Sequence, residues 1–159
     1  NFTQFNYDGS VDQGQIFLSR SGKIRFEYAD PSPLLLVSDG KFMVQHDKDL
    51  ETTDRIPLSS TPLSFFLSED VNLATDVDVV GLIKTVNDVR VSARDGSGEV
   101  DGTLTMVFSS PDLQLREWIV DDSLGTQTRV SLSDLKVNER IDPRLFNFRE
   151  DSIRNRRGR

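Results

Sequence analysis

The sequence predicts a mainly β domain whose strands form an antiparallel barrel or sandwich, with very little helix. Short runs of alternating apolar and polar residues fill most of the chain, as expected for a sheet with one wet face. Turn residues such as Asp8-Gly9 and Asp39-Gly40 separate these runs at regular intervals. Only one stretch has helical spacing. Strands of even length joined by regular turns indicate a barrel or a sandwich.

The length of 159 residues fits one domain that is large enough to bury a core. We expect residues 1–150 to form this domain. Residues 151–159 are polar and rich in arginine, so we expect them to form a basic, flexible tail. Apolar residues make up 36% of the chain, which suits a thin sheet better than a core of several layers.

The first half of the chain predicts six strands, which are residues 2–7, 15–20, 23–28, 34–37, 41–46 and 51–57. In the third run, Ile24, Phe26 and Tyr28 alternate with charged residues, so they share one face. Asp39-Gly40 joins the fourth and fifth runs and is a hairpin signal, because glycine readily adopts positive φ. The sixth run is the most polar and predicts an edge strand.

One short helix is predicted over residues 61–68. Thr61 is a good N-cap and Pro62 is favoured at the first helical position. Leu63, Phe66 and Leu67 follow at the i, i+3 and i+4 spacing that places apolar side chains on one helix face. Because the helix is so short, we expect it to act as a lid over the sheet, and not as a core helix.

The second half returns to strands, which are predicted at residues 76–80, 86–94, 103–108, 113–121 and 126–132. In the third of these runs, Leu104, Met106 and Phe108 alternate with polar residues and share one face. The fourth run contains Trp118, the only tryptophan of the chain. The turn-rich residues 95–98 and 123–125 separate these strands.

Charge and composition exclude several classes of function. The net charge of −7 argues against nucleic acid as the main partner, because phosphate neutralisation needs a basic surface. No apolar run approaches the roughly 18–20 residues of a membrane-spanning helix. The chain has no cysteine and a single histidine, His46, so a catalytic triad, a thiol nucleophile and a histidine-rich metal site are not expected.

Acidic residues are numerous, yet they predict neither a hydrolase nor a metal site. Most lie in turns, where aspartate has a structural reason to be. The neighbouring pairs 47/49 and 121/122 match no calcium-binding loop, and we expect them to be solvated turn residues. His46 shares a strand face with Phe42 and Val44 and is expected to line that face. We therefore expect no metal and no cofactor.

The apolar face of the sheet is the candidate binding site. A curved sheet must have its apolar face covered, and residues 61–68 are the only clear cover that the sequence offers. A partly covered apolar face is a ligand site by default. Arg20 ends the strand face that carries Ile16 and Leu18, so its guanidinium either reaches solvent at the rim or bonds to backbone carbonyls of a covering segment.

Several segments of the chain resemble the LolA family. Residues 14–28, with Arg20 before a Phe-Glu-Tyr ending, are similar to the family pattern of a strand, Arg-Pro-Gly and Phe-Arg-Trp-Glu-Tyr, although Ser21 and Phe26 stand in place of the proline and the tryptophan. Residues 37–40 and 47–50 resemble its Ser-Asp-Gly and Asp-x-Asp-Leu segment. Residues 118–128 resemble its Asp-x-x-Gly-x-x-Thr hairpin, and residues 137–138 and 145–148 its closing segment. The order of these pieces covers residues 1–148.

The resemblance implies an open, unclosed antiparallel β-barrel with a helical lid over a hydrophobic cavity, and an N-terminal helix upstream of Asn1. It implies that Leu63, Phe66 and Leu67 form the lid and that Arg20 is the latch that holds the lid closed. The expected cavity residues, which combine this resemblance with the strand faces above, are Ile16, Leu18, Ile24, Phe26, Tyr28, Val44, Leu104, Met106 and Trp118.

The resemblance also implies a function, which is that of a monomeric, non-enzymatic carrier in the periplasm. Such a carrier binds the acyl chains of lipoproteins, takes them from an inner-membrane ABC transporter and delivers them to an outer-membrane receptor. Two alternatives stay open. LolA-like folds also occur in envelope-stress sensors, which bind a lipid or protein partner without shuttling lipoproteins. A carboxylate-based hydrolase would differ from both by turnover.

Overall fold

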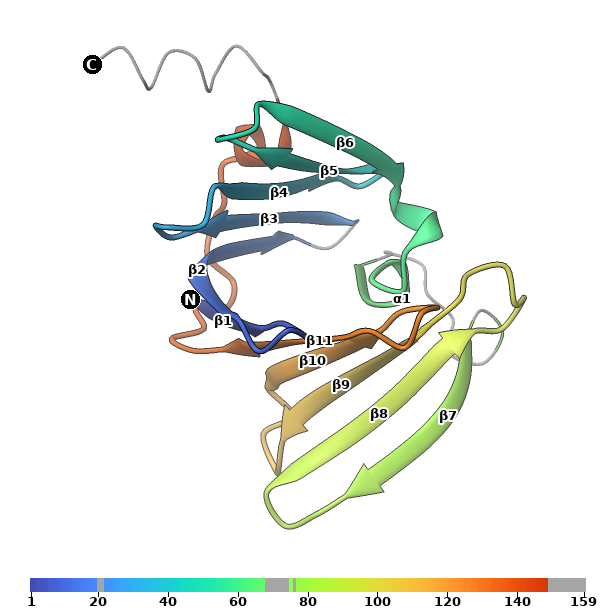
Figure 1. The fold of residues 1–159 in the computed structure, drawn as a ribbon. Coiled ribbons are helices and arrows are strands. Elements are labelled where there is room, and N and C mark those ends of the chain that lie inside the picture. The colour runs from blue at the N-terminus through green and yellow to red at the C-terminus, as the bar shows by residue number, and fades with distance from the viewer. Residues whose placement is uncertain (20–21, 68–74, 76, 149–159) are drawn as a thin grey trace.

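The fold is a single, strongly curved antiparallel sheet of eleven strands (Figure 1). The computed structural model describes residues 1–19, 22–67, 75 and 77–148. The strands, in chain order, are β1 (Phe2–Phe5), β2 (Val11–Ser19), β3 (Lys23–Tyr28), β4 (Leu34–Asp39), β5 (Phe42–Asp47), β6 (Thr52–Pro57), β7 (Val77–Lys84), β8 (Asp88–Asp95), β9 (Thr103–Ser109), β10 (Leu115–Asp121) and β11 (Gln127–Leu132).

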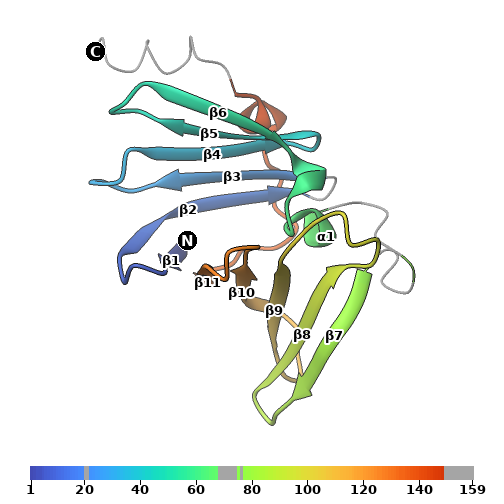
Figure 2. The same ribbon diagram turned by 45° about the vertical axis from the view of Figure 1, so that its right-hand side comes forward.

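The strands lie in the order β6-β5-β4-β3-β2-β1-β11-β10-β9-β8-β7, so β1 joins the two halves of the chain. Strands β6 and β7 are the two edges and do not pair with each other, which leaves the barrel open. The expected open, unclosed antiparallel barrel is therefore confirmed, and so is the edge position of the polar strand β6. Figure 2, turned by 45°, shows the gap between the β6 side and the β7–β9 side of the sheet.

The sheet bends sharply where β2 passes from β1 to β3. Gly14 pairs with Phe2 on one side and with Tyr28 on the other. A Cβ atom at position 14 would collide with the backbone carbonyl oxygen of Glu27 and approach the Phe2 ring to 2.8 Å. Only glycine allows the backbones to come this close, and the bend turns the apolar faces of the two halves toward each other.

The main hydrophobic core lies on the inner side of this curve. We call this side the concave face, and we call the opposite side of the sheet the outer face. The buried members of this core are Phe2, Ile24, Phe26, Met43, Leu58, Leu67, Leu104, Trp118 and Val130. They come from six strands and from the segment after β6, so one core holds both halves of the chain together.

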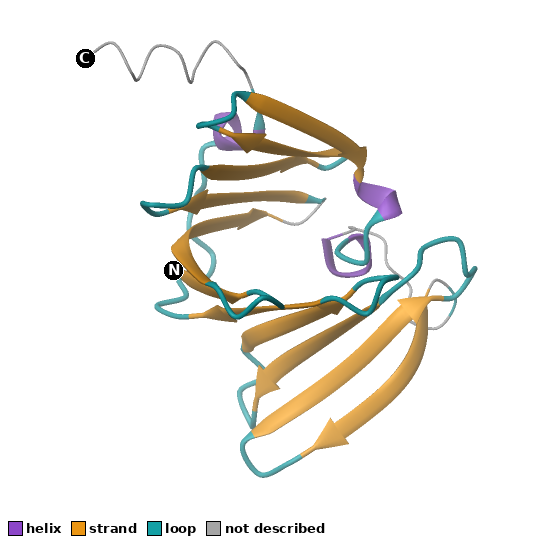
Figure 3. Ribbon diagram, viewed as in Figure 1, coloured by secondary structure: helices purple, strands orange, loops and turns teal. Residues whose placement is uncertain are grey.

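The only helices in the described part of the chain are very short (Figure 3). Two 3₁₀ turns, η1 (Leu58–Ser60) and η2 (Pro143–Phe146), flank the sheet, and the single α-helix is α1 (Ser64–Leu67). Helix α1 lies against the concave face (Figure 1). Among the described residues, no helix is long and apolar enough to cross a membrane.

The helix begins later than expected, and its expected cap is wrong. Helix α1 begins at Ser64, and Thr61 ends η1 instead of capping α1. The hydroxyl group of Thr61 donates a hydrogen bond of 2.8 Å back to the carbonyl oxygen of Leu58. A threonine hydroxyl can donate a hydrogen bond to a preceding carbonyl or accept one from a following backbone N–H. In this protein it donates to the preceding 3₁₀ turn.

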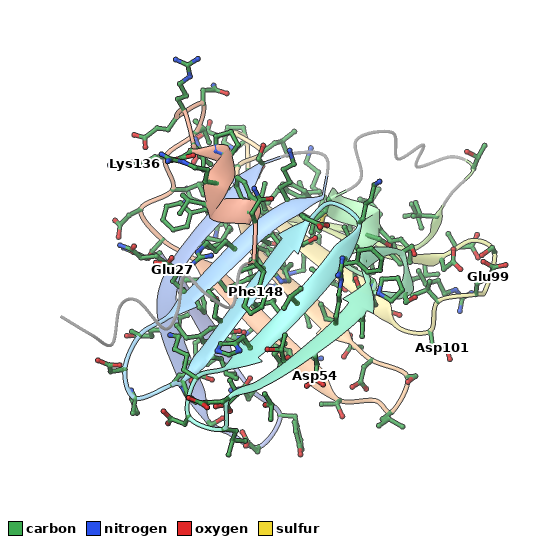
Figure 4. All side chains as sticks on the ribbon, turned by 90° about the horizontal axis from the view of Figure 1, so that it is seen from above. Glu27, Asp54, Glu99, Asp101, Lys136 and Phe148 are labelled. Atoms are coloured by element: carbon green, nitrogen blue, oxygen red, sulfur yellow. The ribbon has the colours of Figure 1, made fainter. Side chains whose placement is uncertain are left out.

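A second apolar cluster lies on the outer face, beneath the C-terminal segment of residues 133–148. Leu35, Val37, Val44 and His46 share this face, since Leu35 pairs with His46 and Val37 with Val44. Phe146, 3% exposed, belongs to η2, which packs over β3 and β4. The ring of Phe148 lies 5.5 Å from that of His46, and Figure 4 shows Phe148 over this part of the sheet.

Candidate functional site

The concave face gathers eight of the nine expected cavity residues into one cluster. Ile24, Phe26, Leu104 and Trp118 are at most 3% exposed, and Ile24 and Leu104 are completely buried. The partly buried residues that pack against them include Ile16, Leu18, Tyr28 and Met106. The alternation within each strand therefore predicts these faces correctly.

The ninth expected cavity residue, Val44, is on the wrong side of the sheet. It pairs with Val37, which pairs with Arg25, and all three side chains therefore point to the outer face. Its neighbour Met43 occupies the concave face and joins the core. Both faces of β5 carry apolar residues, so alternation alone does not show which face is concave. A shift of one residue in the assignment exchanges the two faces.

Aromatic rings form the centre of the concave face. Phe26 lies edge-on to Phe2, with ring centroids 5.0 Å apart, and edge-on to Trp118 at 6.0 Å. Tyr28 completes the group at 5.1 Å from Phe2. Edge-to-face contacts of this kind add to the free energy of area burial alone. The residues come from β1, β3 and β10, so the centre of the face forms only when both halves of the sheet meet.

The lid packs directly onto this apolar face. Leu67 of α1 is 1% exposed, and Leu63 and Phe65 pack against the same core. The backbone N–H of Gly22 donates a hydrogen bond of 2.6 Å to the carbonyl oxygen of Leu67, which ties the end of α1 to the β2–β3 turn. The expected lid positions Leu63 and Leu67 thus cover the sheet. The side chain of Phe66 and the expected latch Arg20 lie outside the described residues.

Sequence reasoning missed several members of the concave face. Phe2, Met43, Leu58, Phe65 and Val130 all belong to the core or pack against it. Phe2 and Val130 lie on strands with clear alternation, and they could have been found by assigning a face to every strand. Leu58 and Phe65 lie in the short helical segments, where no such period exists.

A connected group of polar side chains lies on the concave face along β1 and β2. The Tyr28 hydroxyl donates to Gln4 Oε1 (2.8 Å), Gln4 Nε2 donates to Asn6 Oδ1 (2.8 Å), and Asn6 Nδ2 donates to Asp12 Oδ2 (2.8 Å). Burial, followed by the negative charge of Asp12, raises the pKa of Tyr28 to about 12. Tyr28 is therefore a neutral hydrogen-bond donor at physiological pH.

The acidic residues serve the turns, as predicted. Asp39 Oδ1 accepts from the backbone N–H groups of Lys41 and Phe42, and Asp122 Oδ1 accepts from those of Leu124 and Thr126. These bonds stabilise tight turns and occupy the carboxylates. In the described part of the chain, no group of three or more His, Cys, Asp or Glu residues is arranged to hold a metal ion.

The loop between β8 and β9, where Figure 4 labels Glu99 and Asp101, lines a polar hollow. Asp95 accepts hydrogen bonds from the Ser97 hydroxyl and from the backbone N–H groups of Glu99 and Val100. The Ser97 and Val100 bonds chiefly lower the pKa of Asp95 to about 2. The carboxylate is committed to its own turn, so this hollow is not a candidate catalytic centre.

His46 lines the outer face together with Val44, as their shared strand face predicts. It is 7% exposed, and its Nδ1 lies 3.0 Å from the Thr53 hydroxyl. The ring faces Phe148 and lies on the opposite side of the sheet from Phe26. The only imidazole of the chain is thus a packing residue of the outer cluster. The chemistry that the concave face offers is the binding of apolar groups next to one polar strip.

The sequence can be compared with known proteins on this basis. Residues 1–149 match the family model described as outer membrane lipoprotein carrier protein LolA. Three curated relatives are each described as an outer-membrane lipoprotein carrier protein. They come from Legionella pneumophila strain Paris (31% identity, 94% of this chain and 77% of the relative), Pseudomonas syringae pv. syringae (30%, 92% and 74%) and Halorhodospira halophila (26%, 92% and 72%).

A solved structure of a LolA superfamily protein from Nitrosomonas europaea aligns with 92% of this chain and 87% of its own, with a TM-score of 0.47 and 9% identity. The family assignment comes from the sequence match, which spans the whole sheet, the lid segment and η2. The family model also covers the segment around Arg20 on which the resemblance depends. The chain belongs to the LolA family of outer membrane lipoprotein carrier proteins.

Proposed function

We propose that this protein is a periplasmic carrier that binds the acyl chains of lipoproteins and delivers them to the outer membrane. One observation carries the proposal: a short helix, held in the described part of the chain by apolar contacts and by the backbone hydrogen bond from Gly22 to Leu67, covers an apolar face of an open sheet. A cover of four residues can be displaced without unfolding the sheet, because α1 takes no part in the pairing of the strands. A displaced lid exposes apolar surface of the kind that acyl chains bind.

The energetics of binding favour reversible transfer. Each buried CH₂ group of an acyl chain contributes about 0.8 kcal/mol, so a long chain on an empty apolar surface would bind too tightly to be released. In the closed state Leu67 and Leu63 already occupy the concave face. Incoming acyl chains have to replace these contacts, and only the difference between the two sets of contacts appears as affinity.

The carrier role includes partners and a latch. We propose a monomer that takes lipoproteins from an inner-membrane ABC transporter and hands them to an outer-membrane receptor, without cofactor, metal or catalysis. Arg20 is the proposed latch that favours the closed, empty lid. An Arg20→Leu variant is then expected to accept lipoprotein but to transfer it poorly, because the closed empty state no longer drives release. A normal transfer rate in that variant would rule out the latch.

Trp118 provides the test of acyl-chain binding. It is 2% exposed at the centre of the concave face, in contact with Phe26, so exchange of the lid for acyl chains changes its surroundings. We would titrate the protein with a triacylated lipopeptide and follow the fluorescence of Trp118. The matched control is the same peptide without its acyl chains.

Saturable binding of the acylated peptide alone supports the carrier and justifies a transfer assay between inner and outer membrane vesicles. Equal binding of both peptides, or binding of neither, contradicts the carrier. Binding of both would favour the alternative of a sensor that recognises a protein partner through the same face.

A further inference from the structure

The polar strip of the concave face is a chain of four side chains, Tyr28, Gln4, Asn6 and Asp12. At its inner end, Tyr28 contacts the buried Phe2 ring. At the end near solvent, Asn6 Nδ2 also donates to the hydroxyl of Ser10, which is exposed in the β1–β2 turn. The strip therefore leads from the apolar core to solvent along one face of the β1–β2 hairpin.

Gln4 lies beside an apolar residue of the core. On one side it pairs with Asp12, and on the other with the buried Val130, which in turn pairs with Trp118. A side-chain amide is tolerated at such a position only if it forms hydrogen bonds, because an unsatisfied polar group on an apolar face destabilises the fold. The bonds to Tyr28 and Asn6 meet that need in the closed protein.

One hydrogen-bond donor and one acceptor of the strip nevertheless have no side-chain partner among the described residues. A glutamine amide has two N–H groups, and within the described part of the chain the Gln4 side chain uses one, toward Asn6. Asp12 likewise accepts through Oδ2 and leaves Oδ1 without a side-chain partner among the described residues. Because Gln4 and Asp12 are directly opposite in the β1–β2 ladder, the two side chains that carry this donor and this acceptor are neighbours on the concave face.

A neighbouring donor and acceptor match a secondary amide. Such an amide accepts a hydrogen bond at its carbonyl oxygen and donates one from its N–H group. We propose that Gln4 and Asp12 bind the amide that joins an acyl chain to the first residue of a lipoprotein. The inference rests on the proposed carrier function. It adds a polar subsite that places the acyl chain toward Phe2 and Trp118 and the polypeptide toward the exposed β1–β2 turn.

The charge of the strip selects among acylated ligands. Asp12 repels the carboxylate of a free fatty acid, whereas an N-acylated peptide is neutral at the junction and donates to Asp12. Apolar pockets with a few placed polar groups take their orientation and specificity from those groups. The concave face would thus distinguish an acylated polypeptide from a free lipid of equal chain length.

The test compares three probes by Trp118 fluorescence: an N-palmitoyl peptide, the same peptide with its junction amide methylated on nitrogen, and 1-hexadecanol, which has the chain but no amide. The variant is Gln4→Met, which keeps the length of the side chain and removes both its donor and the acceptor for Tyr28. Gln13→Met is the matched control, because Gln13 is the neighbour of Asp12 on β2, is exposed and points to the outer face. Gln4→Glu, which keeps the acceptor for Tyr28, serves if Gln4→Met does not fold.

We expect Gln4→Met to weaken binding of the N-palmitoyl peptide about 5- to 10-fold and to leave 1-hexadecanol binding unchanged, with Gln13→Met affecting neither. N-methylation should weaken binding to the unmodified protein by a similar factor. Equal affinity for the methylated and unmethylated peptides would overturn the amide subsite while leaving the carrier intact. A protein that binds none of the three probes would overturn the carrier function itself.

Discussion

The carbonyl oxygen of Leu67, the last residue of α1, accepts a 2.6 Å hydrogen bond from the backbone N–H of Gly22 in the β2–β3 turn. This bond fixes the lid to the sheet without any side chain. Gly22 has a φ of +78°, and a Cβ atom there would lie 2.7 Å from Leu58 Cδ2 and 2.8 Å from the Cα of Gly40. The turn, η1 and the end of the lid are thus packed around one glycine.

A Gly22→Ala substitution should therefore open the lid and destabilise the fold. Positive φ costs an alanine about 1–2 kcal/mol, and the clash with the Gly40 backbone adds to it because a backbone atom cannot rotate away. We expect a loss of at least about 2 kcal/mol in the free energy of unfolding, measured by urea denaturation. Faster hydrogen exchange of the backbone N–H at position 22 should accompany it.

Gly9→Ala is the control for this substitution. Gly9 has a similar φ of +84°, and no atom lies within 4 Å of the position of its Cβ, so only the cost of the backbone conformation remains. The Gly9 variant should lose about 1 kcal/mol and keep the exchange rate of the Gly22 amide. Equal losses in the two variants would show that packing around Gly22 does not matter.

The two faces of the sheet should respond differently to one added polar group. Met106→Gln places an amide on the concave face at nearly constant volume, and Val44→Thr places a hydroxyl on the outer face. We expect Met106→Gln to weaken acylated lipopeptide binding about 5- to 10-fold, because an acyl chain would then have to desolvate the amide. Val44→Thr should leave affinity unchanged and lower the free energy of unfolding by about 1–3 kcal/mol. A loss of affinity in Val44→Thr would contradict the assignment of faces.

These faces also show how far sequence reasoning reaches in this protein. Alternation locates the strands within a few residues and places Ile24, Phe26, Leu104 and Trp118 correctly. It is clearest on β3, whose other face carries only charged residues. It fails at Val44, because β5 is buried on both faces. The second layer of packing that causes this burial, the C-terminal segment, is remote in sequence and has no period that would reveal it.

The start of the helix and the polar strip could not be predicted from the sequence for other reasons. Thr61 and Pro62 form a valid helix start, but the carbonyl of Leu58 competes for the threonine hydroxyl, and only the path of the chain after β6 decides between them. The contact of Tyr28 with Gln4 depends on the bend at Gly14, which brings β1 and β3 together on either side of β2. A bend of this kind is a property of the sheet and not of any one strand.

The C-terminal segment should contribute strongly to stability. Phe146 is 3% exposed, and Arg25 Nη1 donates a 3.1 Å hydrogen bond to the carbonyl oxygen of Leu145, so the segment is held at adjacent residues. Phe146→Ala should lower the free energy of unfolding by about 3–5 kcal/mol in urea. Leu135→Ala is the control, since Leu135 is 45% exposed and should cost less than about 0.5 kcal/mol. Similar costs for both would mean that η2 does not depend on Phe146.

Tyr28 should make stability depend on pH in the alkaline range. Its pKa is about 12 in the folded protein, raised mainly by burial, and about 10 in the unfolded chain. Between these values the unfolded chain releases the Tyr28 proton more readily, so the free energy of unfolding falls as pH rises from 10 to 12 and is unaffected by this group below pH 10. A difference of two pKa units corresponds to roughly 2–3 kcal/mol.

Tyr28→Phe should remove this part of the pH dependence. At neutral pH the variant loses the hydrogen bond to Gln4 and about 1 kcal/mol, and toward pH 12 its stability should equal or exceed that of the unmodified protein because no buried phenolate can form. Tyr7→Phe is the matched control: Tyr7 is 76% exposed, so its removal should leave the slope unchanged. Urea denaturation series from pH 8 to pH 12 would decide the matter, since parallel curves for all three proteins would show that Tyr28 ionises freely in the folded state.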